Sequence, residues 1–329
     1  MRRGGDGPGG GRGRARRGMV VSALIACTLS LAAVGAHGRQ EAQKVVRIDT
    51  LNVRDTLYHL WGGGGNGLAL IDENSGGVIL VDTKLPGWSQ PTLDALEAVT
   101  DLPVTTIINT HAHADHSGSN GEFATAVQIV AHENTRANMA RMDAYQGANA
   151  GLLPNRTFGE KLSLLDGVNR IDLYYFGPAH TNGDTVVVFP AKGVAHVGDL
   201  FPSKATPVID PINGGSASAY PETLARAVAG ITGVNRVITG HTPPPSTYAG
   251  AGRRLLPSPT LPPRWMSWKD FAEYADFTRD FLAAVRDAIG AGKSVDEAVA
   301  SLKLPDRYKD YGMEHAKANV EAIYKELVK

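Results

Sequence analysis

Cysteine is almost absent from this chain of 329 residues, because Cys27 is its only one. A single cysteine excludes a disulfide within the chain. Cys27 also lies among the first 38 residues, so the chain after residue 38 contains no thiol. Any metal site in that part must therefore be built from nitrogen and oxygen ligands alone.

The chain also lacks net charge, since its 33 lysines and arginines balance its 33 acidic residues. The balance conceals a basic start, because residues 1–38 hold six arginines and one aspartate, a net charge of +5. The remainder therefore carries 27 basic and 32 acidic residues, a net charge of −5. A mildly acidic body argues against general nucleic-acid binding, which needs a basic surface. Hydrophobic residues make up 43% of the chain, an ordinary globular share, so disorder throughout is excluded.

The first 38 residues are typical of an export signal. Met1–Gly18 is rich in glycine and arginine, and Met19–Ala36 is apolar and uncharged. This run ends in small residues at Gly35 and Ala36, of the kind that signal peptidase prefers. We predict a signal peptide over 1–38 that is removed, which implies a periplasmic or secreted protein without stable membrane association. An uncleaved membrane anchor is the alternative, because the apolar run is long enough for a short span.

The rest of the chain predicts an α+β fold in three parts. Residues 39–250 hold short apolar runs typical of strands, including a hairpin of Leu68–Ile71 with Val78–Val81, separated by helical segments such as Tyr220–Gly230. Residues 251–264 are rich in proline and predict a linker. Residues 265–329 predict a helical extension, whose aromatic stripe at three- and four-residue spacing indicates packing onto the main body. A homo-oligomer interface or a lid is the alternative for this stripe.

One short run carries most of the chemical information. His111, His113, Asp115 and His116 form a His-x-His-x-Asp-His sequence directly after the apolar segment Val104–Thr110. The cluster therefore stands where a strand ends. Imidazole is the commonest zinc ligand, and a neighbouring carboxylate suits a second position.

Three further candidates follow apolar strands at turns that contain glycine or proline. These are His180, Asp199 and His241. Each alone is weak evidence, but with the first cluster they make seven nitrogen and oxygen ligands that can share one sheet edge. The remaining histidines of the body do not stand in a comparable ligand motif, and we predict that they are structural or exposed. They are His59, His132, His196 and His315.

This ordered set resembles the metallo-β-lactamase superfamily, and the likeness spans roughly Val45 to Thr242. The resemblance implies a four-layer αββα sandwich with a dinuclear site that holds two zinc ions per chain. It implies that one ion is held by His111, His113 and His180, the second by Asp115, His116 and His241, and that Asp199 bridges both. Asp82 matches an acid that orients a ligand in the family. Asn213–Ser216 matches a turn beside the family's site.

The resemblance further implies a zinc-dependent hydrolase in which a metal-bridging hydroxide attacks a carbonyl and Asp115 orients it or transfers a proton. Its small-molecule substrate is expected to be a cyclic amide, a lactone or an ester. A thioesterase like glyoxalase II, a mononuclear iron oxidoreductase like the persulfide dioxygenases, and a non-catalytic metal-binding protein are the alternatives. The chain lacks a Gly-x-Ser-x-Gly nucleophile elbow, which fits metal-dependent hydrolysis.

Two segments bear on substrate access. Trp61–Gly67 is glycine-rich and predicts either a mobile flap over the site, with Trp61 as an apolar wall, or a plain flexible turn. Lys204 follows Asp199 by five residues, and we predict a solvated lysine rather than an anchor for a substrate carboxylate.

Overall fold

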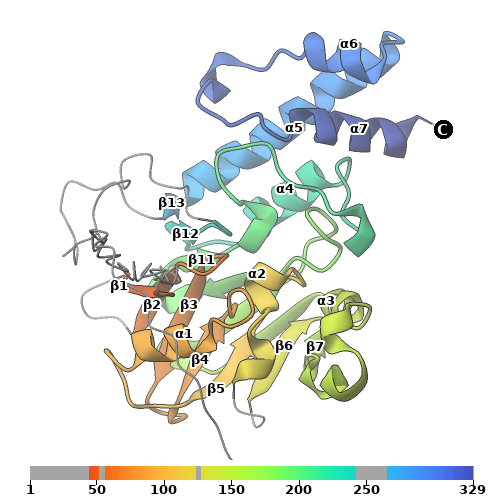
Figure 1. Ribbon diagram of the computed structural model, residues 1–329. Coiled ribbons are helices and arrows are strands. Elements are labelled where there is room, and N and C mark those ends of the chain that lie inside the picture. The colour runs from red at the N-terminus through yellow and green to blue at the C-terminus, as the bar shows by residue number, and fades with distance from the viewer. Residues whose placement is uncertain (1–43, 52–55, 124–126, 242–264, 329) are drawn as a thin grey trace, which may run out of the picture. The chain divides into compact units, whose positions relative to one another are not determined.

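Two mixed β-sheets form the centre of the computed structural model, which describes residues 44–51, 56–123, 127–241 and 265–328 (Figure 1). All of these residues belong to one compact unit that begins at Lys44. The predicted signal peptide (1–38) and the predicted linker (251–264) lie outside the described residues. No helix within the described ranges is long and apolar enough to cross a membrane.

The first sheet combines an antiparallel half with a parallel half. Its spatial order follows the chain: β1 (Arg47–Thr50), β2 (Leu57–Trp61), β3 (Gly67–Asp72), β4 (Gly77–Val81), β5 (Val104–Ile108), β6 (Gln128–His132) and β7 (Arg156–Phe158). Strands β1 to β4 pair antiparallel, and β4 to β7 pair parallel. The parallel strands β4, β5 and β6 end at one edge, and this edge carries the first histidine cluster.

The second sheet is mostly antiparallel. Its spatial order is β13 (Met266–Ser267), β12 (Arg236–Ile238), β11 (Val194–His196), β10 (Val186–Phe189), β9 (Ile171–Tyr174) and β8 (Lys161–Leu164). Only β11 and β12 pair parallel, so both run toward the same edge. Asp199 follows β11 and His241 follows β12, which brings these two residues together.

The sheets pack face to face because their strands are apolar on both sides. In β3, Leu68 and Leu70 face the second sheet, whereas Ala69 and Ile71 face the helix α1 (Ser89–Leu96). All six residues of β3 are buried, the pattern expected of a strand covered on both faces. The sheet-to-sheet core and the two outer cores give the four-layer αββα sandwich that the sequence predicted.

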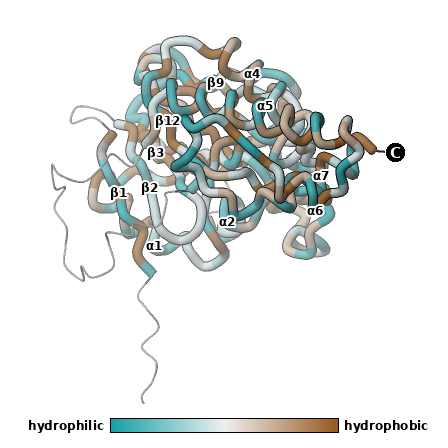
Figure 2. The backbone as a smooth tube through the Cα atoms, turned by 90° about the horizontal axis from the view of Figure 1, so that it is seen from above, coloured by the Kyte–Doolittle hydropathy of each residue, from teal (hydrophilic) through white to brown (hydrophobic). Residues whose placement is uncertain are grey.

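The second outer layer is helical and continues into the C-terminal region. A single apolar cluster joins the second sheet to α4 (Tyr220–Gly230), α5 (Trp268–Gly290), α6 (Val295–Ala300) and α7 (Ala316–Leu327). The aromatic stripe of α5 is buried in this cluster, as predicted, through Phe271, Tyr274 and Phe281. Figure 2 shows the accompanying alternation of hydrophilic and hydrophobic residues along the C-terminal helices.

Local signals begin the helices of this region. Ser267 and Asp270 form a reciprocal capping box at the start of α5, and Ser294 and Glu297 form another at α6. The prediction of helix throughout 265–329 is wrong at its start, because Met266 and Ser267 pair with β12 as an edge strand. The boundaries predicted for the separate domains stay predictions.

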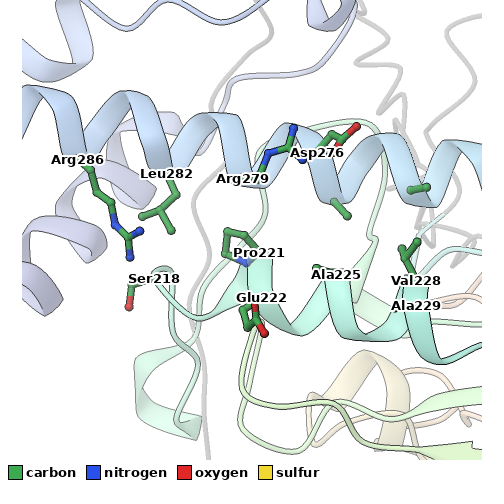
Figure 3. A pocket seen from close by; sticks show the side chains of 12 residues that line it. Ser218, Pro221, Glu222, Ala225, Val228, Ala229, Asp276, Arg279, Leu282 and Arg286 are labelled. Carbon is green, nitrogen blue, oxygen red and sulfur yellow. Dashed lines mark hydrogen bonds and ion pairs between the residues drawn. The ribbon is translucent and has the colours of Figure 1, made fainter.

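Shorter helices complete the fold. The remaining α-helices are α2 (Ala114–Ser117) and α3 (Glu133–Met139), and the 3-10 turns are Asn120–Glu122, Asp143–Tyr145, Gly147–Leu152, Gly167–Asn169, Pro190–Lys192, Gly198–Leu200, Pro211–Asn213 and Asp306–Tyr308. A groove of about 540 Å³ separates α4 from α5 (Figure 3). Pro221 and Val228 of α4 and Leu282 of α5 line it, and none of the seven predicted ligands does.

Candidate metal centre

The seven predicted ligands meet at one edge of the sandwich. His111 and His113 follow β5, while Asp115 and His116 lie in α2, directly after them. His180 follows β9, Asp199 lies in the 3-10 turn after β11, and His241 follows β12. Residues up to 130 positions apart in the chain thus converge because four strands, β5, β9, β11 and β12, end at the same edge.

The side chains form two groups that share a boundary. The ligand atoms of His111, His113 and His180 lie within 4.8 Å of one another, and so do those of Asp115, His116 and His241. This partition is the one that the family resemblance implies. Whether these residues bind metal stays a prediction at this point.

Asp199 lies between the two groups. Its Oδ1 is 3.4 Å from His116 Nε2, and its Oδ2 is 3.4 Å from His241 Nε2 and 3.7 Å from His180 Nε2. One carboxylate therefore faces both groups, as expected of a bridging ligand.

The rings of His111 and His116 each have their N–H turned away from the centre. His116 Nδ1 donates to Asp82 Oδ2 at 2.7 Å. The Thr110 hydroxyl donates to the same carboxylate at 2.8 Å, so it accepts from His111 Nδ1 at 3.1 Å. Both imidazoles therefore keep a lone pair on Nε2, the atom that faces the centre.

His113 and His180 are held in the same way from the segment after β11. His113 Nε2 donates to Asp210 Oδ2 at 2.7 Å, and His180 Nδ1 donates to the Val208 carbonyl at 2.7 Å. The lone pairs of His113 Nδ1 and His180 Nε2 then face each other at 2.9 Å. Two lone pairs at this distance repel unless a cation or a proton lies between them.

Buried ligand atoms without hydrogen-bond partners are a second indication of a bound cation. His111 Nε2, His116 Nε2 and Asp199 Oδ1 are buried and have no hydrogen-bond partner among the described residues. Buried polar atoms without partners are costly, and several at one point indicate an ion that satisfies them. The oxygen and nitrogen donor set suits zinc or iron.

The charges at the centre reinforce this interpretation. Burial and the adjacent His116 ring lower the pKa of His111 well below its usual value. Burial alone would lower the pKa of His116, but the carboxylates of Asp82 and Asp199 raise it well above the usual value. Burial opposes ionisation of Asp199, yet the His116 ring holds the pKa of this carboxyl well below its usual range. The centre thus sets the carboxylates of Asp82 and Asp199 around the His116 ring, and a cation bound at its Nε2 would take the place of the proton that these carboxylates favour.

Backbone conformation at Asp82 serves the same arrangement. Asp82 follows β4 with φ of 61°, a left-handed conformation that costs a non-glycine residue about 1–3 kcal/mol. In this conformation its carboxylate reaches the backbone N–H of Thr110 at 2.8 Å as well as His116. The sequence prediction that Asp82 orients a ligand agrees with these contacts.

The glycine-rich segment after β2 packs directly against the centre. A Cβ at Gly65 would overlap the His116 ring, and a Cβ at Gly240 would overlap Asp199 Oδ1. The Gly65 N–H donates to the Asp115 carbonyl at 3.0 Å, and Asn66 N–H donates to the Gly240 carbonyl at 2.7 Å. These contacts place Trp61–Gly67 against the centre, and its movement as a flap or as a flexible turn stays a prediction.

Three other sequence expectations have clear outcomes. Trp61 donates from Nε1 to Asp49 Oδ2 at 2.8 Å on β1, so it forms no wall of the centre. Lys204 is not simply solvated, because its Nζ lies 2.6 Å from Asp270 Oδ1 and 3.7 Å from Glu273 Oε1. His59, His132 and His196 are buried, whereas His315 is exposed, as predicted for structural or exposed histidines.

Sequence reasoning missed Asp210 and Val208. Asp210 precedes a proline and caps a 3-10 turn by accepting from the N–H groups of Ile212 and Asn213. This pattern signals a turn, but no local signal shows that the same carboxylate reaches His113, 97 positions away.

A cavity of about 550 Å³ opens beside the second group of ligands. Its lining includes Asp199 and His241 on one side and Asp310, Glu314 and His315 on the other. Cavities of this size hold ordinary small molecules. The C-terminal region therefore contributes a wall next to the candidate metal centre.

The pattern of the Metallo-beta-lactamase superfamily matches residues 62–267. Among curated proteins, the alpha subunit of 2,4-dinitroanisole O-demethylase from Nocardioides sp. (strain JS1661) is 38% identical over 45% of this chain and 44% of its own length. Hydroxyacylglutathione hydrolase from Synechocystis sp. (strain ATCC 27184 / PCC 6803 / Kazusa) is 32% identical over 35% of this chain and 41% of its own length. This chain thus spans less than half the length of both relatives.

Among solved structures, a sec-alkylsulfatase from Pseudomonas sp. has a TM-score of 0.67 at 14% identity, covering 86% of this chain and 50% of that one. A metallo-beta-lactamase from Pontibacter korlensis has a TM-score of 0.53 at 16% identity, covering 71% of this chain and 99% of that one. At such identities these likenesses concern the fold alone.

Proposed function

Because the chain belongs to the metallo-beta-lactamase superfamily, we propose that it is a zinc-dependent hydrolase with two ions per chain. The observation that carries the proposal is the set of inward lone pairs. His113 Nδ1 and His180 Nε2 face each other at 2.9 Å, and three further ligand atoms are buried without partners among the described residues. A purely structural core would not leave several buried polar atoms without partners, because each of them costs stability.

The proposed ligands are His111, His113 and His180 for one ion, Asp115, His116 and His241 for the other, and Asp199 for both. When bound, two zinc ions lower the pKa of a shared water and polarise a substrate carbonyl. The chain supplies the preorganisation: Asp82, Thr110, Asp210 and the Val208 carbonyl fix the rings. Asp115 Oδ2, 3.3 Å from His241 Nε2, is the group placed to hold or move a proton during turnover.

We propose that the substrate is a small molecule with a cyclic amide, lactone or ester carbonyl, bound in the cavity beside Asp199 and His241. The size of this cavity, about 550 Å³, supports a small molecule. Lys204 does not serve as a carboxylate anchor in this proposal, because Asp270 and Glu273 neutralise it.

Metal content and turnover test the proposal together. Protein purified without added metal is analysed by elemental mass spectrometry, then assayed with lactones, β-lactams and esters. About two zinc ions per chain and hydrolysis that a chelator abolishes are expected. One iron per chain with little zinc, together with oxygen uptake, contradicts the proposal in favour of the oxygenase alternative.

A second candidate reaction is thioester hydrolysis. It is favoured by the 32% identity with a relative named hydroxyacylglutathione hydrolase, over 35% of this chain. The same panel therefore includes hydroxyacyl thioesters, and also 2,4-dinitroanisole because of the 38% identity with the demethylase subunit. The preferred substrate is the one with the highest kcat/KM.

Export is a separate proposal that rests on residues 1–38 alone. We expect a mature protein without this segment in the periplasm or the medium. Fractionation of cells that express the full chain, with mass determination of its N-terminus, tests this. Recovery of the uncut chain with membranes favours the anchor instead.

A further inference from the structure

We propose that helix α7 positions the metal centre, with Asn319 and Glu326 as the positioning residues. This inference rests on the proposed function, since it requires that His113 and His180 hold an ion. Its basis is the segment from Thr206 to Ser218, called here the support segment. This segment provides the Val208 carbonyl that accepts from His180 and the Asp210 carboxylate that accepts from His113, both at 2.7 Å.

The support segment has little structure of its own. Its only helical part is the 3-10 turn Pro211–Asn213, and it exposes two apolar side chains, Val208 at 45% and Ile212 at 83%. An irregular segment with outward apolar groups gains little from its own packing. Contacts from elsewhere must therefore hold its two acceptors in place.

Helix α7 and the turn before it hold the first end of the support segment. The buried side chain of Asn319 donates to the Pro207 carbonyl at 2.7 Å, directly before Val208. The backbone N–H of His315 donates to Thr206 Oγ1 at 3.0 Å, and the Thr206 N–H donates to the Gly312 carbonyl at 2.8 Å. The Val208 carbonyl is thus one residue away from an anchored peptide group.

Glu326, in the last turn of α7, holds the second end. Its carboxylate accepts from Ser216 Oγ at 2.8 Å, from the Ala217 N–H at 2.9 Å and from the Ser218 N–H at 3.0 Å. The adjacent Gly215 N–H donates to the Asp210 carbonyl at 2.7 Å. One helix therefore fixes both ends of the segment whose middle orients two ligand rings.

The middle of the support segment is held from the opposite side by the end of α3. Asn138 Nδ2 donates to the Asn213 carbonyl at 3.2 Å, and Arg141 donates to the Ile212 carbonyl at 3.2 Å. These contacts belong to the sandwich itself. What the C-terminal region adds is the pair of end anchors, so loss of these anchors should loosen the ligand rings without unfolding the sandwich.

The test measures zinc affinity of the full-length protein by chelator competition. Variants are N319D, which is isosteric but removes the donor to Pro207, E326A, and E326Q as the conservative variant that keeps an acceptor. E321Q is the matched control, because the exposed Glu321 on the same helix makes no hydrogen bond to the support segment among the described residues. D210N serves as the benchmark for direct loss of a ring partner, with an expected weakening of about 10- to 100-fold.

The expected result is a weakening of roughly 3- to 10-fold for N319D and E326A, less than for D210N because the effect is indirect. E326Q should recover part of the affinity. The cobalt-substituted protein should show altered visible absorption in N319D and E326A, since the geometry of the rings changes. The double variant D210N/E326A should lose less than the sum of its parts, because both act on the same ring.

A merely structural role predicts something different. The two variants would then lower the melting temperature of the metal-free protein, while zinc affinity and the cobalt spectrum would stay within twofold of the unsubstituted protein; that result overturns the inference. Absence of zinc binding in the unsubstituted protein overturns the proposed function, and the inference with it. The two failures are therefore distinguishable.

Discussion

At the scale of single residues, four of the five histidines of the centre depend on a partner that fixes their tautomer: His111, His113, His116 and His180. Asp82, Thr110, Asp210 and the Val208 carbonyl each take one ring N–H, and this leaves the other nitrogen free for a cation. Asp82 and the histidine motif could be predicted from the sequence. Asp210 and Val208 could not, because their role depends on contacts across 97 and 28 positions rather than on a local pattern.

The substitution Asp115→Asn tests the proton-handling role. Asparagine preserves the shape of the side chain but removes its charge and its basicity, so kcat on the best substrate should fall by about 100-fold or more. The free energy of unfolding should change by less than about 1 kcal/mol, because Asp115 is partly exposed. Stopped assays and urea unfolding measure both quantities, with Asp101→Asn on an exposed loop as the control. Near-normal hydrolysis by the Asp115 variant would contradict the mechanism.

His196 predicts a pH dependence of stability. Burial lowers its pKa to about 4, and its Nδ1 accepts from the Gly198 N–H at 3.1 Å while Nε2 faces the Asn66 carbonyl at 3.2 Å. The folded state therefore binds fewer protons than the unfolded state between pH 4 and about 6.5. Stability rises with pH across this window and is lost as the pH falls toward 4.

The substitution His196→Gln should reduce that dependence. From pH 7.5 to pH 5, the unsubstituted protein should lose about 2 kcal/mol more unfolding free energy than the variant, measured by urea unfolding at each pH. All other ionisable groups are common to the two proteins, so the comparison isolates His196. His315→Gln, at an exposed position, should leave the slope unchanged, and equal slopes for all three proteins would refute the prediction.

At the scale of elements, strand ends determine where the centre lies. The apolar runs of β3 and β4 could be predicted from the sequence because burial on both faces leaves a continuous hydrophobic pattern, and β5 and β6 could be predicted from their β-branched residues. The strands β7, β8 and β13 could not, since they are three, four and two residues long and their pairing partners, rather than their composition, make them strands. The anchoring of Trp61–Gly67 could not be predicted either. In the sequence alone a glycine indicates conformational freedom, and its close packing is seen only when its neighbours in the fold are known.

The substitution Gly65→Ala tests that close packing. A Cβ at this position would overlap the His116 ring, so the ring or the segment must move. We expect the zinc affinity of the Asp115, His116 and His241 group to fall by more than about 10-fold, with roughly 1–3 kcal/mol of lost stability from overpacking. Gly159→Ala is the control, since a Cβ there meets nothing within 4 Å. Equal zinc affinity of both variants would show that the segment accommodates the added methyl group, and would contradict the prediction.

At the scale of the whole molecule, the C-terminal region is part of the site rather than an appendage. The family pattern ends at residue 267, yet Asp310, Gly312, Glu314 and His315 line the cavity beside Asp199 and His241. A parallel bridge between Ala205 and Gly312 attaches this wall to the sandwich. Family membership therefore accounts for the candidate ligand set, whereas one wall of the cavity beside it comes from a part of the chain that the family pattern does not match.

The charge of this wall predicts which substrates are disfavoured. Lys204 is neutralised by Asp270 and Glu273, so the carboxylates of Asp310 and Glu314 give the outer wall a negative character. Substrates with a carboxylate near the scissile carbonyl should have a higher KM than neutral analogues.

The double substitution D310N/E314Q tests this prediction. It should lower KM for the anionic substrate by about two- to fivefold at low salt and leave KM for the neutral analogue unchanged. The zinc content should also stay unaltered. The difference should shrink at high ionic strength, because the carboxylates are exposed. An equal change for both substrates would mean that the wall acts through shape, and then size rather than charge would set the preference of this enzyme.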